Sequence, residues 1–116
     1  MAASLSISLL QIPAAAEQIK TRVAQENFDA FIKSCRSKSL PAATCECMAL
    51  KMIDQGRDGE IALDVIGLQA RNITDKAAEK REFVGLLDRY HVTPTQAQSA
   101  LASAKTHAEQ FASQCN

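Results

Sequence analysis

Four cysteines are the residues of this chain whose type and spacing are best suited to chemistry. Cys35, Cys45 and Cys47 form a C-x9-C-x-C pattern, and Cys115 follows next to the C-terminus. Thiols can pair as disulfides, bind a soft metal ion or exchange with other disulfides. On a helix, side chains two positions apart point about 200° apart. Cys45 and Cys47 therefore cannot bond to each other, and each needs a different partner.

We expect the four thiols to form two structural disulfides that staple a small domain. Four cysteines allow three pairings, and the sequence alone does not choose among them. Cys35 ends a predicted helix, and a short connection brings it near the first turns of the next helix, so we prefer Cys35–Cys45 with Cys47–Cys115. The pairing Cys35–Cys47 with Cys45–Cys115 is a close alternative. Closing the long Cys47–Cys115 loop would contribute about 4 kcal/mol in the chain-entropy description.

A copper site or another soft-metal site is the alternative hypothesis for these residues, because thiolates, thioethers and imidazoles are soft or borderline ligands. The candidate ligands are Cys45, Cys47, Met48 and Met52, with His91 or His107. Against this hypothesis, a helical C-x-C pattern splays its sulfur atoms, and the methionines suit a hydrophobic core equally well. The chain also lacks a C-x-x-C pair and clustered histidines, which zinc sites of familiar spacing contain. We expect no metal and no cofactor.

Catalytic motifs are missing from the sequence, so we predict no catalytic residues and no enzymatic activity. Thiol–disulfide exchange favours a C-x-x-C pair at a helix N-terminus, and Cys45 and Cys47 lie several residues inside their predicted helix. The sequence contains no G-x-S-x-G, H-E-x-x-H or glycine-rich phosphate loop. We interpret His91 as a helix C-cap and His107 as a surface residue.

The elements that must position the cysteines are helices, because apolar residues recur at helical spacing almost throughout. Five helices are expected, over residues 14 or 17 to 35, 41–55, 58–70, 75–90 and 94–115. Asp58 is the predicted N-cap of the third helix, Thr74 or Asp75 caps the fourth, and Thr93 with Gln96 forms a capping-box pattern. The predicted fold is an all-α single-domain bundle of about five helices stapled by two disulfides. Its central helix would be the one over residues 41–55.

The last predicted helix has a regular apolar seam. The seam residues follow a 4-3-4-3-4 spacing: Ala97, Leu101, Ala104, Ala108, Phe111 and Cys115. Such a seam packs against another helix. It could pack within the monomer or across a homodimer. Two glycines inside predicted helices, Gly67 and Gly85, are expected to mark close helix crossings, since an interior glycine costs about 1 kcal/mol relative to alanine.

The N-terminus resembles an export signal. No charge precedes Glu17, the apolar stretch from Leu5 to Ile12 is too short to span a bilayer, and three alanines follow Pro13. A signal usually opens with Lys or Arg, and this one does not. Residues 1–16 are therefore interpreted as a signal peptide or an apolar N-terminal arm, and residues 17–116 as the helical domain. The expected location is periplasmic or secreted.

The charge balance excludes one class of partner. Lys and Arg number 13, Asp and Glu number 13, and the formal net charge is +0. Cations alternate with anions, as in Glu79-Lys80-Arg81-Glu82, which is typical of a solvated helix face. Nucleic-acid binding needs a basic surface, so we expect no nucleic-acid partner. No segment of the mature chain is apolar enough to cross a membrane.

Two cysteine-bearing segments resemble a known pattern. They are Phe28-Asp-Ala-Phe-Ile-Lys-Ser-Cys35 and Cys45-Glu-Cys47-Met-Ala-Leu-Lys, with Cys115 as the later cysteine. The chain is similar here to small exported proteobacterial helical proteins with a C…C-x-C…C pattern, mostly of unassigned function. The resemblance implies export and disulfides, and it implies no active site.

The leading functional hypothesis is an exported, disulfide-stapled helical protein that acts by binding a protein partner. An inhibitor, an immunity protein or an accessory subunit of an envelope system would suit its size. Two alternatives remain open at this point. One is a carrier that encloses a small apolar ligand between its helices, and the other is the soft-metal binding protein considered above.

Overall fold

The computed structural model describes residues 20–115, and these residues form six α-helices without a β-strand. The helices are α2 (Gln25–Arg36), α3 (Ala42–Asp54), α4 (Arg57–Ala70), α5 (Lys76–Tyr90), α6 (Pro94–Thr106) and α7 (Ala108–Gln114). The predicted all-α class with two disulfides is therefore confirmed. The proposed signal segment, residues 1–16, and the predicted helix start at residue 14 or 17 lie outside the described residues.

Local sequence signals set several of the helix starts. The Asp75 carboxylate accepts hydrogen bonds from the backbone N–H groups of Ala77 and Ala78, and Thr93 forms a capping box with Gln96. The Thr93 cap was predicted, and Asp75 is one of the two caps, Thr74 or Asp75, that the sequence predicted for α5. The start of α4 differs from the prediction, because the helix begins at Arg57 and its N-cap residue is Gly56 rather than Asp58. Gly56 has φ 92°, which lets the chain reverse between α3 and α4 within two residues.

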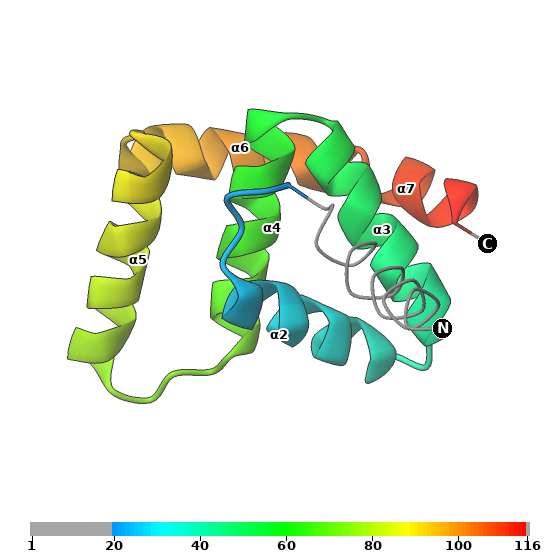
Figure 1. The fold of residues 1–116 in the computed structure, drawn as a ribbon, viewed down its shortest axis with the longest axis horizontal. Coiled ribbons are helices and arrows are strands. Elements are labelled where there is room, and N and C mark those ends of the chain that lie inside the picture. Colours follow the sequence, from blue (N-terminus) through cyan, green and yellow to red (C-terminus); the bar gives the residue numbers. More distant parts are fainter. Residues whose placement is uncertain (1–19, 116) are drawn as a thin grey trace, which may run out of the picture.

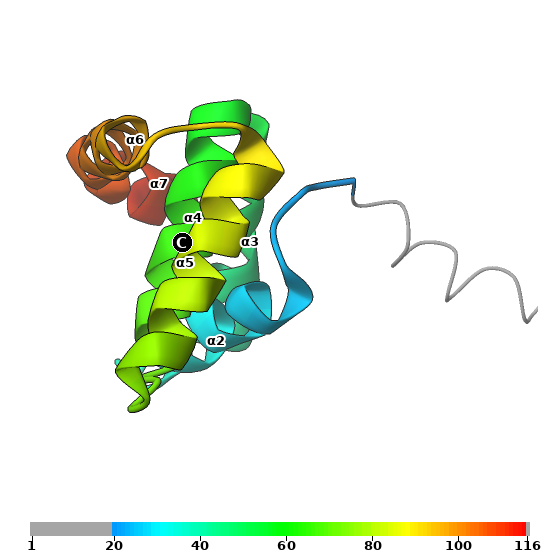
Figure 2. The ribbon, with the colours of Figure 1, turned by 90° about the vertical axis from the view of Figure 1, so that its left-hand side faces the viewer.

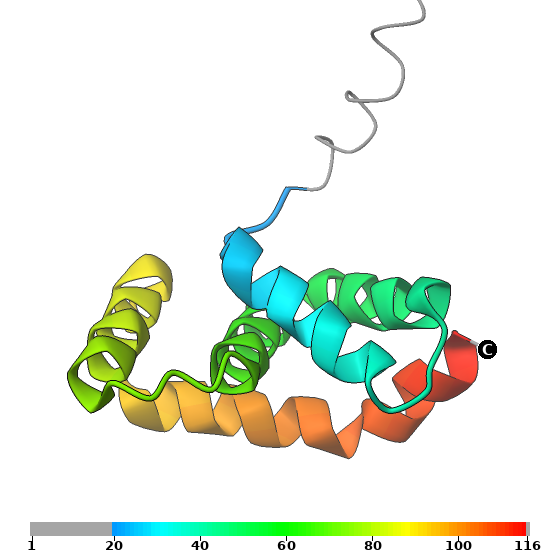
Figure 3. The same ribbon diagram turned by 90° about the horizontal axis from the view of Figure 1, so that it is seen from below.

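The central element is α4, and the prediction that the helix over residues 41–55 is central is wrong. Figure 1 shows α4 between α3 and α5, with α2 crossing its lower end, and α4 contacts α2, α3, α5 and α6. Figures 2 and 3 show that α6 covers the face of α4 opposite residues 20–24. Eight of the 14 residues of α4 are buried, so this helix meets neighbours on almost every side.

The last predicted helix is two helices, which break at His107. The break lets α6 pack on α4 while α7 packs on α3. The seam residues Ala97, Leu101, Phe111 and Cys115 are buried, whereas Ala108, directly after the break, is exposed. A single straight helix could not reach both neighbours. The seam is thus used within the chain, and it does not present a free dimer face.

The two glycines inside helices have different environments. A Cβ atom on Gly67 would lie 2.0 Å from the backbone oxygen of Asn27, so α2 and α4 cross in contact at this point, as predicted. A Cβ atom on Gly85 would meet nothing within 4 Å, so the prediction of a close crossing at Gly85 is wrong within the chain. Gly85 lies on the exposed side of α5.

These environments predict opposite effects of the same substitution. Gly67→Ala should lower the free energy of unfolding by about 1–3 kcal/mol, because its methyl group forces α2 away from α4. Gly85→Ala should raise it by up to about 1 kcal/mol, because alanine favours the helix and meets no atom. Urea unfolding followed by circular dichroism, at low protein concentration, measures both. A loss of stability in Gly85→Ala would contradict this account of α5.

Candidate functional site

The four cysteines lie where two disulfides join three parts of the chain. Cys35 bonds to Cys45 and joins the end of α2 to the start of α3, with 5.8 Å between the Cα atoms. Cys47 bonds to Cys115, which follows α7, with 5.7 Å between the Cα atoms. This is the pairing preferred from the sequence. The two sulfurs on α3 face different neighbours, as residues two positions apart on a helix must.

The residues of the soft-metal hypothesis have other roles in the structure. Cys45 and Cys47 are bonded in disulfides and are not thiolates. The Met52 side chain is 5 % exposed and belongs to the hydrophobic core, and Met48 packs against that core. Among residues 20–115, no three His, Cys, Asp or Glu side chains gather where they could hold one metal ion.

The two histidines lie at helix ends. His91 follows α5 as its C-cap residue in the left-handed conformation, at φ 55°. His107 occupies the break between α6 and α7, where its Nδ1 atom lies 2.8 Å from the Ser103 carbonyl oxygen. Both side chains are exposed. The expected positions at a helix cap and at the surface are therefore confirmed.

A buried carboxylate on α4 is the main polar feature that the sequence analysis missed. The Asp64 side chain is fully buried, and its two oxygens accept hydrogen bonds from three side chains. Asn27 Nδ2 lies 2.6 Å from Oδ1, while Arg89 Nη2 and Tyr90 Oη each lie 2.8 Å from Oδ2. The backbone N–H of Ala24 also donates to Oδ1, at 3.3 Å. The carboxylate thus connects α4 to α2, to α5 and to the segment that precedes α2.

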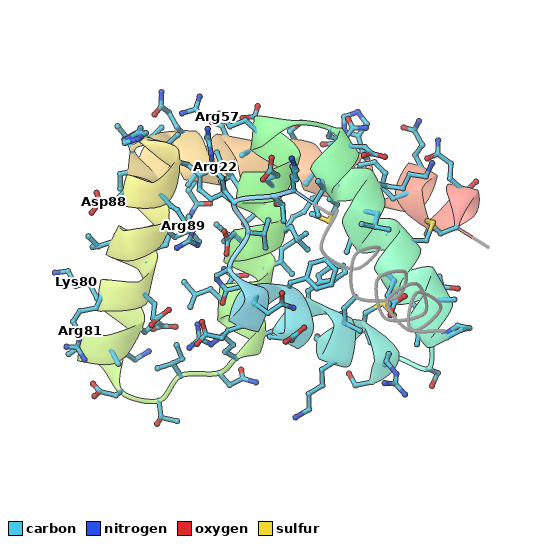
Figure 4. The ribbon with its side chains drawn as sticks, viewed as in Figure 1. Arg22, Arg57, Lys80, Arg81, Asp88 and Arg89 are labelled. Atoms are coloured by element: carbon cyan, nitrogen blue, oxygen red, sulfur yellow. A yellow bond between two sulfur atoms is a disulfide. The ribbon has the colours of Figure 1, made fainter. Side chains whose placement is uncertain are left out.

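Burial and the Asp64 carboxylate together shift the pKa values of Tyr90 and Arg89. Burial raises the pKa of the Tyr90 phenol above its ordinary value of 10.0, and the negative charge of Asp64 raises it further. Burial alone would lower the pKa of Arg89, but its hydrogen bond to Asp64 and the charge of Asp64 outweigh burial and raise that pKa. Figure 4 shows the Arg89 side chain directed from α5 toward α4. Tyr90 therefore stays neutral and Arg89 charged, as their hydrogen bonds to Asp64 require.

Side chains of α4 and α5 also bind residues 21–24, which cross α4 in an extended conformation. Thr21 Oγ1 and the Arg22 backbone N–H donate to Glu60 Oε1, at 2.6 Å and 2.8 Å. Arg89 Nε donates to the Arg22 carbonyl oxygen at 3.0 Å. These bonds explain why α2 begins only at Gln25 although apolar spacing predicts an earlier start. The backbone of this segment is bound by side chains of α4 and α5 instead of forming a helical turn.

One signal in the sequence could have revealed the network. Asp64 stands inside the otherwise apolar run from Ile61 to Leu68, where every neighbouring position suits a core. A charged residue is almost never fully buried unless it is paired. Its partners could not be identified, because Asn27 and Arg89 are far from it in sequence and each has the polarity of an ordinary surface residue.

An open groove between α2 and α3 has a volume of about 790 Å³. Its larger apolar lining residues are Phe28, Ile32 and Leu40, which we call the apolar floor. Leu40, in the connection between the helices, is 38 % exposed. The full lining is Phe28, Asp29, Ile32, Lys33, Arg36, Ser37, Ser39, Leu40, Pro41, Ala42 and Glu46. The Cys35–Cys45 disulfide joins the two helices that form the walls.

The charges around this groove are of both signs. Asp29, Lys33 and Arg36 follow one another at spacings of four and three along α2, and Glu46 lies opposite on α3. An apolar floor with a mixed charged rim fits a protein segment that carries an apolar anchor and charged flanks.

No protein-family model, curated protein or solved structure matches this chain. The two disulfides are typical of proteins that fold in an oxidising environment outside the cytoplasm. Within residues 20–115, no helix has the length and apolar character needed to cross a membrane.

Removal of the buried carboxylate should show how much the fold depends on it. Asp64→Ala leaves the Arg89 charge and the Asn27 amide without their partner, so we expect a loss of about 3–5 kcal/mol in the free energy of unfolding. Asp54→Ala, at an exposed position, is the matched control and should change stability by less than about 0.5 kcal/mol. Urea unfolding measures both values. Equal stability of the two variants would show that the network contributes little.

The raised pKa of Tyr90 predicts how the protein unfolds in alkali. Because this pKa is higher in the folded chain than in the unfolded chain, the contribution of Tyr90 is complete below about pH 10 and is lost above it. Tyr90 is the only tyrosine and the chain has no tryptophan, so phenolate absorbance reports this residue alone. We expect the phenolate signal to appear only as helical circular dichroism is lost. The urea-unfolded chain should ionise near pH 10, and similar ionisation of the folded chain would contradict the burial of the phenol.

Proposed function

We propose that this protein is an exported binding domain that acts through a protein partner, and that the groove between α2 and α3 receives that partner. The observation that carries the proposal is the apolar lining at Phe28, Ile32 and Leu40, of which Leu40 is exposed and the other two are partly buried, inside a rim of both charges. A protein segment satisfies both parts of this surface, because an apolar anchor can fill the floor while flanking charges pair with Lys33 or Glu46.

The Cys35–Cys45 disulfide supports this proposal energetically. It joins the last turn of α2 to the start of α3, directly beside the groove. A groove that is already rigid loses little conformational entropy when it binds, so more of the contact energy contributes to affinity. A periplasmic or secreted location suits a domain that depends on this bond. An inhibitor, an immunity protein or an accessory subunit of an envelope system fits a small binding domain of this kind, which would have no catalytic activity of its own.

A carrier for small apolar molecules is supported less well. Ligand sites of that kind are clefts or cavities of about 300–1,000 Å³ that bury most of the surface of the ligand. The more enclosed cavity between α4, α6 and α7 holds about 140 Å³, and polar groups of Gln55, Asp58 and His107 contribute to its lining. The large groove is open to solvent along its length. A protein segment can fill and cover such a groove, whereas a small ligand would remain largely hydrated.

The test compares two leucines with the same exposure. Leu40 lies in the groove and Leu50 lies on α3 outside it, and each side chain is 38 % exposed. The oxidised chain and the variants Leu40→Glu and Leu50→Glu would each be immobilised and exposed to cell-envelope extracts of the source organism. We expect the wild type and Leu50→Glu to retain the same protein, and Leu40→Glu to retain at least tenfold less of it, since a charge would replace the apolar anchor point.

Folding of each variant is checked by circular dichroism and by the absence of free thiols. Native mass spectrometry of the purified chain detects a retained small molecule instead of a protein. Equal retention by Leu40→Glu and Leu50→Glu would place the partner elsewhere on the surface. Retention of no specific protein by the wild type would count against the proposed function itself.

A further inference from the structure

The outer face of α5 has no neighbour within the described part of the chain. Figure 1 shows α5 at one end of the molecule, where its inner face meets α4. Leu86 and Tyr90 on the inner face are buried. The opposite face consists of five exposed residues, Ala77, Arg81, Val84, Gly85 and Asp88, and we refer to these five residues as the outer α5 face.

The outer α5 face has the pattern of a helix-packing seam. Ala77, Arg81, Val84 and Asp88 follow one another at spacings of four, three and four, which keeps them on one side of a helix. Val84 is 45 % exposed and is one of the large apolar side chains that the fold leaves at the surface. Figure 4 shows the Arg81 and Asp88 side chains on the side of α5 away from α4.

Gly85 lies at the centre of this face, where the fold itself does not require a glycine. A Cβ atom at this position would meet nothing within 4 Å, and the residue has ordinary helical geometry without a positive φ. A glycine inside a helix is unfavourable unless something approaches it closely. Gly67 shows the alternative in the same molecule, because the backbone of α2 occupies the space that a side chain would need there. The backbone of a partner that packs closely against α5 would occupy the space beside Gly85 in the same way.

The charges on the outer α5 face favour a second copy of α5 as its partner, in the antiparallel orientation. Arg81 and Asp88 are seven positions apart, about 10.5 Å along the helix axis, and they point in nearly the same direction. The midpoint between them falls between Val84 and Gly85. Neither residue makes an ion pair within residues 20–115. In a second copy of α5 that runs antiparallel about this midpoint, each Arg81 would face Asp88 of the second copy. A parallel copy would place like charges opposite each other.

We propose that the outer α5 face is a self-association surface, on which two copies of this chain pair antiparallel about a two-fold axis at Val84 and Gly85. Val84 of one copy contacts Val84 of the other on one side of the axis. The two Gly85 residues face each other on the other side and let the helix axes approach. Two Arg81–Asp88 ion pairs flank the centre. The contact is isologous, so it closes as a dimer and leaves no free face.

This inference is independent of the proposed partner groove. The groove lies between α2 and α3, and α5 lies beyond α4 on the other side of the molecule (Figure 1). A contact made by one helix face falls in the small-interface class, below about 1,200 Å² in total. We therefore expect a weak dimer that forms at high protein concentration and dissociates on dilution.

Charge reversal tests the proposal. Sedimentation equilibrium on the oxidised full chain, over a wide concentration range, measures the dissociation constant of the dimer. Arg81→Glu and Asp88→Arg each place like charges opposite one another, so each should raise that constant about tenfold or more. The double variant Arg81→Glu with Asp88→Arg restores opposite charges and should return the constant to within about threefold of the wild type. Lys105→Glu, the matched control on α6, should leave it unchanged.

A further variant disrupts the proposed contact without changing the charge, so that effects of charge on folding can be separated from effects on association. Gly85→Gln places a helix-favouring side chain at the centre of the face, so the monomer should fold normally while the dimer is lost. A wild-type chain that stays monomeric up to about millimolar concentration would overturn the proposal, since weak specific contacts are detectable there. A dimer that is insensitive to the single charge reversals, or a double variant that does not recover, would also overturn it.

Discussion

The carboxylate of Asp64 is the interaction on which the arrangement of the helices depends. It lies fully buried on the central helix, and its hydrogen-bond partners come from α2, from α5 and from the segment before α2. A buried charge is unfavourable unless nearly all of its hydrogen-bonding capacity is used. All three segments must therefore be in place together, and a shift of any one of them would leave the charge without a partner. This requirement selects one packing of the hydrophobic core around the carboxylate.

The two ends of the molecule are stabilised by different means. On the α5 side, the polar network around Asp64 holds α5 and residues 21–24 against α4. On the α3 side, two disulfides join α2, α3 and the end of α7. The chain has no tryptophan and one tyrosine, so its core buries limited aromatic area. The proposed partner groove lies at the covalently stapled end, whereas the proposed self-association face lies at the end held by hydrogen bonds.

Local patterns predicted the features that depend on local chemistry. The helical class, the caps at Asp75 and Thr93, and the divergence of Cys45 and Cys47 all follow from spacing along one helix. The features that depend on distant residues could not be predicted in the same way. The late start of α2 depends on Glu60 and Asp64, and the break at His107 depends on the separate positions of α3 and α4. The groove depends on the approach of α2 to α3, for which the sequence offers only the preferred Cys35–Cys45 bond.

The separation of the cysteines along the chain has a consequence for biogenesis. Cys35, Cys45 and Cys47 all precede Cys115 by a long stretch, and the native partner of Cys47 is 68 residues away. A chain that enters an oxidising compartment N-terminus first exposes three thiols before the fourth arrives. The loops from Cys35 to Cys45 and from Cys35 to Cys47 are almost equal in length, so closure entropy does not distinguish them. Correct pairing requires that Cys47 stay reduced, or be released again by thiol exchange, until α7 packs against α3.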